Sequence, residues 1–225
     1  MYVNIIIPTY KRFESLQRTL HSIKKSDYKK TLTTVIVDGF QDDRHTQLKD
    51  SQTAVVYNPE RKDWPRSMNE ALKRIEGDLF LYGADDIQFY PDCIRKLVET
   101  MESVYPSGDG LVALKQSQKR SGGAFGLIGN KFVERFPERA VFCPDYLHFG
   151  SDAELRDFAT KVGLYYFRTD AVVFHDRSFR SAAVHDEAFD IGRAARARDL
   201  GTYKMRRRKG YLWGENFHRL NKEDA

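Results

Sequence analysis

The sequence has few cysteines and no long apolar segment. Cys93 and Cys143 are its only cysteines, and they lie far apart without CxxC or Cys/His ligand spacing, so neither a disulfide framework nor a zinc site is indicated. The opening "MYVNIII" has no basic leader, and no stretch reaches the roughly 18 apolar residues of a membrane span. We therefore expect a soluble protein of the reducing cytoplasm, with no transmembrane segment.

Charge is present in quantity but unevenly placed. Residues 1–175 carry 25 Lys and Arg against 24 Asp and Glu, whereas residues 176–225 carry 12 against 8. Within this end, residues 193–209 hold eight basic residues and one acid, a density that suits contact with phosphates or an anionic surface and equally suits a solvated, frayed tail. We predict one domain over residues 1–176 and a basic C-terminal extension over residues 177–225, which packs on the domain or faces its ligand.

Apolar periodicity alternates between strand and helix along the first half of the chain. This rhythm is typical of a mostly parallel sheet flanked by helices, so we predict an α/β fold. The predicted strands cover residues 3–7, 34–38, 54–57, 79–83, 111–115, 164–167 and 171–174, and the predicted helices cover residues 14–25, 66–75, a segment opened by Pro91, and 152–162.

Three carboxylates follow predicted strands. Asp38 ends the second strand, and the adjacent pair Asp85 and Asp86 follows the fourth. Ligands of open α/β sheets bind beyond the carboxyl ends of the strands, so these acids are expected at one rim. Two neighbouring acids repel each other less when a divalent cation joins them to a ligand's phosphates, which favours a metal–diphosphate site. On the dipeptide alone, a polar turn is the better interpretation.

Several motifs in order resemble the family-2-type glycosyltransferases of GT-A fold, across roughly residues 3–176. They are the first strand and turn "IIIPTYKR", the second strand end "VDGFQDD", the block "NEALKRIEGDLFLYGADD", and the later stretches "GSDAELRDFATKVG" and "AVVFH". The chain departs from the family pattern at four positions, which are Gly39, Ala71, Ala84 and Ser151. The loss of an acid at Ala84 leaves fewer carboxylates for a metal.

The resemblance implies a single GT-A-like domain that binds a nucleotide-sugar donor, UDP-linked by family precedent, with Mn²⁺ or Mg²⁺. The implied metal ligands are Asp86 and His175. The implied nucleotide contacts are Thr9, Arg12, Asp38, Asn69 and Asp85. Arg206, Arg207, Arg208 and Lys209 are predicted to contact the acceptor or phosphates. A Gly-rich loop with Lys119 and Arg120 is a candidate to close over the donor.

Asp152 is the predicted catalytic base. Displacing a nucleoside diphosphate with inversion needs a proton acceptor on the opposite sugar face, and Asp152 matches the second acid of the family's acid pair. Ser151-Asp152 at a helix start is also an ordinary capping pattern.

The predicted function is an inverting, metal-dependent glycosyltransferase with a hydroxyl acceptor. One acceptor class is DNA carrying hydroxymethylated pyrimidines, and the other is a surface glycan or lipid-linked saccharide. A catalytically inactive nucleotide-sugar or nucleic-acid binding module is the alternative of another class. A sugar nucleotidylyltransferase fits less well, because its Gly-rich phosphate loop would follow the first strand, where this chain has "PTYKRFE".

Overall fold

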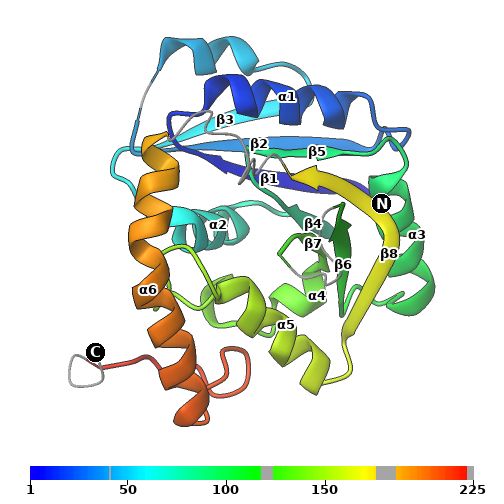
Figure 1. Ribbon diagram of the computed structural model, residues 1–225. Helices are drawn as coiled ribbons and strands as arrows, with labels where there is room; N and C mark the ends of the chain where they lie inside the picture. The colour runs from blue at the N-terminus through cyan, green and yellow to red at the C-terminus, as the bar shows by residue number, and fades with distance from the viewer. Residues whose placement is uncertain (41, 118–123, 176–185, 222–225) are drawn as a thin grey trace.

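A twisted eight-stranded sheet forms the centre of the computed structural model, which describes residues 1–40, 42–117, 124–175 and 186–221 (Figure 1). Within these residues the strand order is β3-β2-β1-β4-β7-β6-β8-β5. The strands are β1 Val3–Thr9, β2 Thr31–Asp38, β3 Thr53–Asn58, β4 Leu79–Tyr82, β5 Ile87–Phe89, β6 Leu111–Gln116, β7 Gly126–Gly129 and β8 Tyr165–His175. The helices are α1 Phe13–Lys24, α2 Asp63–Arg74, α3 Cys93–Val104, α4 Asn130–Val133, α5 Ser151–Lys161 and α6 Glu187–Arg208, with short 3-10 turns η1 Asp43–Leu48 and η2 Pro137–Arg139.

The sheet has a parallel half and a mixed half. Strands β3, β2, β1 and β4 pair in parallel, so their carboxyl ends meet at one rim. β7 runs antiparallel to both β4 and β6, while β8 pairs in parallel with β6 and antiparallel with β5. The predicted mostly parallel α/β fold is confirmed, and the end of β8 is brought back toward the rim formed by the first half.

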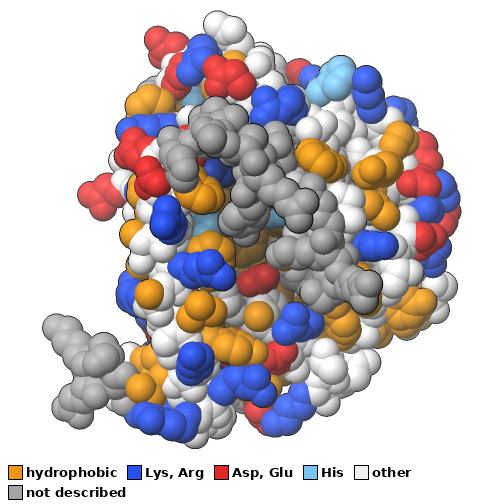
Figure 2. All heavy atoms as spheres, in the orientation of Figure 1, with side chains coloured by type: hydrophobic (Ala, Val, Ile, Leu, Met, Phe, Trp, Pro, Cys, Tyr) orange, Lys and Arg blue, Asp and Glu red, His pale blue; other side chains and the backbone are white. Residues whose placement is uncertain are grey.

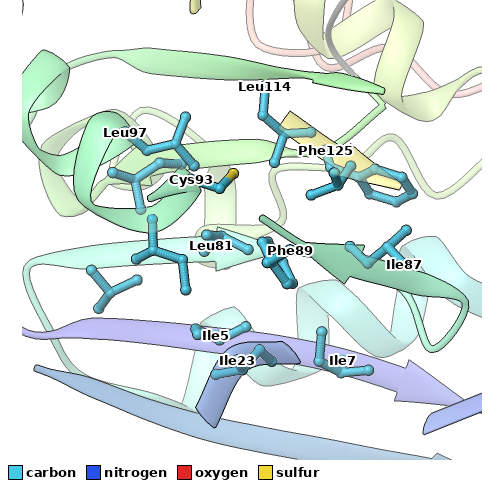
Figure 3. Close-up of a cluster of buried hydrophobic side chains, with 14 of the residues drawn as sticks. Ile5, Ile7, Ile23, Leu81, Ile87, Phe89, Cys93, Leu97, Leu114 and Phe125 are labelled. Atoms are coloured by element: carbon cyan, nitrogen blue, oxygen red, sulfur yellow. The ribbon is translucent and has the colours of Figure 1, made fainter. Parts of the chain in front are cut away.

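Helices cover both faces of the sheet, and alternate strand residues supply the two cores. Ile5 and Ile7 of β1 join the core beneath α1 and α3, whereas Ile6 joins the opposite core with α2, α4 and α5 (Figure 3 shows the first cluster). All three side chains are fully buried. Since both faces are covered, the middle of β1 carries three consecutive apolar residues, at positions 5–7.

The mixed half of the sheet and the C-terminal end differ from the sequence prediction in three places. The two strands predicted over residues 164–167 and 171–174 are one strand, β8, with a register shift between Leu114 and Lys115 of its partner β6. Strands β5 and β7 were not predicted. The predicted basic extension contains α6, a helix of 22 residues that stands against the domain at the left of Figure 1. Among the described helices, none combines the length and apolar character needed to cross a membrane.

Candidate active site

The rim of the parallel half holds a buried polar contact between two strand ends. Thr9 is the last residue of β1, and its hydroxyl donates a 2.7 Å hydrogen bond to Oδ2 of Asp85, three residues beyond the end of β4. Thr9 is 3% exposed and Asp85 is 6% exposed. The pairing of β1 with β4 therefore brings together two residues that are 76 positions apart.

Arg12 lies among three carboxylates. It occupies the N-cap position of α1, and its Nη1 lies 3.6 Å from Oδ1 of Asp85 and 3.3 Å from Oδ2 of Asp86. Its Nε and Nη2 donate to the two carboxylate oxygens of Asp186 at 2.7 and 2.8 Å. Asp186 also caps α6 by accepting from the backbone N–H of Phe189. The sequence analysis missed Asp186, and its only local signal is an acid before a helix.

The carboxylate pair is electrostatically strained. Burial, followed by the charge of Asp86, raises the pKa of Asp85 to about 7, although Arg12 and the Thr9 hydroxyl act in the opposite direction. Burial lowers the pKa of Arg12, but the hydrogen bonds to Asp186 and the charges of the neighbouring acids outweigh burial, so the pKa is raised overall. Arg12 thus stays a cation, and the paired acids gain from any further positive charge.

His175 and Asp86 form a two-residue donor set for such a charge. Nδ1 of His175, at the end of β8, lies 3.1 Å from Oε1 of Gln116, and Nε2 lies 3.2 Å from Oδ1 of Asp86. This second approach lacks hydrogen-bond geometry, so the buried Nε2 has no hydrogen-bond partner among the described residues. Backbone pairing of Ile87 with His175 fixes the approach. An imidazole nitrogen and a carboxylate oxygen facing each other fit Mn²⁺, which accepts both ligand types.

No group of three or more His, Cys, Asp or Glu side chains within the described ranges forms a complete metal cage. This agrees with the alanine at position 84, where the family carries an acid. A cation held by Asp86 and His175 would take its remaining ligands from water and the phosphates of a substrate, as Mg²⁺ and Mn²⁺ commonly do.

Asp38 is buried at the end of β2 and holds the start of α2. Its carboxylate accepts from the backbone N–H groups of Lys62 and Asp63, each at 3.0 Å, and from the Asn58 amide at 2.9 Å. The next residue is Gly39, with φ of 74°, where a Cβ would lie 2.5 Å from the Arg61 nitrogen. This close approach explains why the chain has glycine where the family has a second acid. A nucleotide contact by Asp38 stays a prediction.

Asn69 lies within α2 and joins that helix to a distant backbone segment. Its amide nitrogen donates to the Phe142 carbonyl at 2.7 Å, and its amide oxygen accepts from the Phe142 N–H at 2.9 Å. Both polar atoms of the Asn69 side chain bond to the backbone of Phe142, so this side chain holds α2 against that segment. The predicted nucleotide contact is untested.

Asp152 lies in the first turn of α5 and is partly exposed. Gly150, with φ of 95°, occupies the N-cap position, so Ser151 and Asp152 are the first two residues inside the helix rather than its cap. After burial, the charge of Asp152 is the next cause that raises the pKa of Tyr82, the last residue of β4. Asp152 is therefore close enough to the hydroxyl of Tyr82 to act on it electrostatically.

Arg206 is not a surface residue, which corrects the prediction that it contacts the acceptor or phosphates. Its side chain is fully buried and makes hydrogen bonds to Glu154 of α5, at 2.8 to 3.2 Å, and to Asp145, at 2.7 Å. The neighbouring Arg207, Arg208 and Lys209 are exposed. The loop positions Lys119 and Arg120 lie outside the described residues.

Solved structures with the same fold were found at low sequence identity. A mannosyltransferase, PcManGT from Pyrobaculum calidifontis with GDP-Man and Mn²⁺, matches at TM-score 0.69 and 17% identity over 92% of this chain and 64% of that chain. TarS from S. aureus matches at 0.61 and 15% over 78% and 60%. GalNAc-T7 with UDP, GalNAc and Mn²⁺ matches at 0.63 and 12% over 77% and 43%. The chain thus spans less than two thirds of each of these proteins.

The fold and its acidic rim define the GT-A class of glycosyltransferase folds. The sequence profile of Glycosyl transferase family 2 matches residues 4–119, which is more than half of the chain. The protein belongs to Glycosyl transferase family 2. A comparison with curated proteins found no match.

Proposed function

We propose that the protein is an inverting, metal-dependent glycosyltransferase that moves a sugar from a nucleotide diphosphate donor, a UDP-sugar, to a hydroxyl acceptor in the cytoplasm. The observation that carries the proposal is the buried Nε2 of His175, which faces Asp86 at 3.2 Å without a hydrogen-bond partner in the described structure. Such an atom costs free energy unless a ligand satisfies it. Family membership and the structures solved with nucleotide sugars or UDP and Mn²⁺ support the same reading.

Asp86 and His175 are the residues that would hold the divalent cation. When bound, such a cation supplies positive charge that stabilises a departing diphosphate. Arg12 adds a fixed cation about 3.3 Å from Asp86, so it is placed to hold phosphate oxygens beside that site. The Thr9 hydroxyl orients Asp85, and Asp85 with Asp38 forms the wall that we assign to the ribose and base.

Asp152 is assigned as the base that takes the proton of the acceptor hydroxyl. It comes from α5, a different element from those that carry Asp85 and Asp86, and an inverting displacement needs a proton acceptor on the sugar face opposite the leaving group. Gly150 occupies the N-cap position of α5, so Asp152 is not the N-cap residue of this helix. Arg156 lies one turn along α5 from Asp152, and the charge of Asp152 contributes to raising the pKa of Arg156.

Two acceptor classes fit this site. DNA with hydroxymethylated pyrimidines is favoured by the basic residues of the C-terminal end, and a glycan or lipid-linked saccharide is the second candidate. A binding module without catalytic activity is the alternative function. It is favoured by Ala84 and Ser151, which stand where the family pattern has acids.

The test is turnover with a panel of UDP-, GDP- and TDP-sugars and Mn²⁺, followed by mass spectrometry of the released nucleotide and of any product. We expect donor turnover that is lost on chelation. Asp43→Asn is a control, since Asp43 is an exposed acid in η1. Nucleotide binding without turnover of any donor would favour the binding module, and turnover that persists in EDTA would exclude the metal.

A further inference from the structure

The outward face of α6 carries a cluster of cations. Five of its members share one side of the helix opposite the buried residues, at helical angles that span about a third of a turn. They are Arg193, Arg196, Lys204, Arg207 and Arg208, all exposed. We call these five residues the α6 basic face. Figure 2 shows Lys and Arg side chains along the lower left of the molecule, where Figure 1 draws α6.

Acids are sparse along the α6 basic face, and the nearest exposed one in the helix is Asp190, three residues before Arg193. Asp199 is the only acid between residues 193 and 209, and it is fully buried. Its carboxylate accepts from three consecutive backbone N–H groups, those of residues 147–149. In the described part of the chain, Arg193, Arg196 and Lys204 have no carboxylate partner within 4 Å. Like charges three and four residues apart destabilise a helix, so the cluster is retained at a cost in stability.

The spacing of these cations suits a linear polyanion. Residues 193 to 208 span about 22 Å of helix at 1.5 Å per residue, the length over which a duplex presents roughly a dozen phosphates. A lipid surface fits less well, because membrane-lying helices combine a basic face with bulky apolar side chains, and Leu200 is the only large exposed apolar residue of α6 in the described structure.

The position of α6 relates this face to the candidate active site. At its N-terminus, Asp186 and Glu187 contact Arg12, Lys11 and Tyr10 beside the donor rim. The sign of the charge changes along the helix, from these acids at the site to the cations that begin at Arg193. A polyanion bound along α6 would lie next to the candidate active site. The negative charges of Asp186 and Glu187 would repel the phosphates of that polyanion from the place proposed for the donor's diphosphate.

We propose that the α6 basic face binds the phosphate backbone of duplex DNA. The contact is independent of base sequence, and it presents the duplex to the rim, where a target pyrimidine leaves the stack to reach Asp152. The role of this contact in binding the acceptor rests on the proposed function. The binding of DNA itself does not, because it is measurable without any donor.

The test compares two variants with the same change in net charge. Arg193, Arg196, Lys204 and Arg207, each replaced by Gln, remove four members of the basic face. The control replaces Lys25, Lys29, Lys30 and Lys49 by Gln, exposed positions on or near α1 and η1. Both variants are first shown to melt near the wild-type temperature, and duplex binding is then measured by fluorescence anisotropy over a salt series.

We expect the wild type and the control to bind duplex DNA with similar salt dependence. The α6 variant should bind more weakly, with a log–log salt slope smaller by roughly 0.9 for each phosphate contact removed. Equal loss in both variants would show that net charge alone acts, and absence of duplex binding at low salt would overturn the assignment. Binding to anionic lipid vesicles in place of DNA would overturn it as well. Lack of sugar transfer with intact DNA binding would instead count against the proposed function.

Discussion

Two arginines that each face two acids of the domain, the fully buried Arg206 and the partly buried Arg12, can be compared directly. Arg206 meets Glu154 and Asp145 at 2.7 to 3.2 Å, and it is fully buried. Nη1 of Arg12 lies farther from Asp85 and Asp86, at 3.6 and 3.3 Å. The shorter hydrogen bonds of Arg12 go to Asp186, at the start of α6. The same residue types therefore form one closed cluster and one open cluster.

The difference lies in how completely each cluster satisfies its polar groups. Around Arg206, Glu154 also accepts from the Tyr146 hydroxyl and from the Trp213 backbone N–H. Around Arg12, the pKa of Asp85 is raised to about 7, and Nε2 of His175 has no hydrogen-bond partner in the described residues. A satisfied buried network contributes stability, whereas an unsatisfied one indicates a place for a ligand.

The sharpest way to test this comparison is one Asp-to-Asn change in each cluster. Asp86→Asn should reduce sugar transfer by roughly 10³-fold or more, because a cation that stabilises the leaving diphosphate loses its carboxylate ligand. Its melting temperature should stay near that of the wild type. Asp145→Asn should instead lower the melting temperature, since it weakens a buried ion pair. Full transfer activity in Asp86→Asn would remove the distinction between the clusters.

Asp152→Asn tests the base on the open side. We expect the transfer rate to fall by roughly 10²–10⁴-fold, since the amide cannot accept the proton of the acceptor. Donor binding and melting temperature should be retained, because Gly150 rather than Asp152 occupies the N-cap position. Titration calorimetry with donor and a single-turnover assay measure the two effects. A loss of stability with an unchanged rate would assign Asp152 to the structural group.

Arg206→Met breaks the closed cluster. Removing the cation leaves Glu154 and Asp145 buried with fewer partners, so the free energy of unfolding should fall by about 3–5 kcal/mol. Chemical denaturation measures this change. Arg208→Met is the matched control, since Arg208 is exposed and its replacement should change stability by about 0.5 kcal/mol or less. Equal effects of the two changes would contradict the structural role of Arg206.

The open cluster should also make stability depend on pH in the metal-free protein. The pKa of Asp85 is raised in the fold, from 3.8 to about 7, so the folded state favours its protonated form. The resulting stability is present below about pH 4 and is lost as the pH rises to 7, by on the order of 4 kcal/mol. Asp85→Asn still accepts from Thr9 but cannot titrate. The wild-type melting temperature should fall relative to this variant between pH 5 and 7.5, and parallel curves would contradict the raised pKa.

The smallest expected effect concerns Asp186, the third acid beside Arg12, which the comparison of the two clusters did not include. Asp186→Asn keeps an N-cap for α6 but removes a negative charge beside Arg12, so a nucleoside diphosphate should bind several-fold more tightly, by about 1 kcal/mol. Calorimetry with UDP and Mn²⁺ measures this change. Glu187→Gln removes a charge from the same turn without touching Arg12 and should have less effect. Weaker binding in Asp186→Asn would mean that the carboxylate positions Arg12 for its ligand.

The first half of the fold was predictable because its apolar runs are separated by polar turns. Strands β1 to β4 and helices α1 to α3 lie within a few residues of the predicted ranges. The strand ends then place Asp38, Asp85 and Asp86 at one rim by topology alone. Two strands escaped prediction: β5 has three residues, and β7 reads "GLIG", so neither carries enough periodicity to be recognised.

Helix α6 was not predicted as a helix within the basic extension, because its buried face is nearly devoid of large apolar residues. That face consists of Gly192, Ala195, Asp199 and Arg206. In the run "RRRK", the four cations differ only in helical phase, and a buried carboxylate, Glu154 of α5, lies 52 positions away in sequence. Sequence spacing cannot reveal which arginine turns toward that acid. The contacts of Arg12 with Asp186 and of His175 with Gln116 escaped for the same reason.

The division of α6 into an inner row and an outer row has a use in protein engineering. The inner row is held by close fits, such as Gly192 against the His148 ring, where an added Cβ would lie 3.3 Å from the nearest ring atom. The outer positions 193, 196, 204 and 207 contribute no buried side chain. Under the proposed function, a library randomised at these four positions would vary the ligand that α6 binds while the buried contacts that hold the helix are kept.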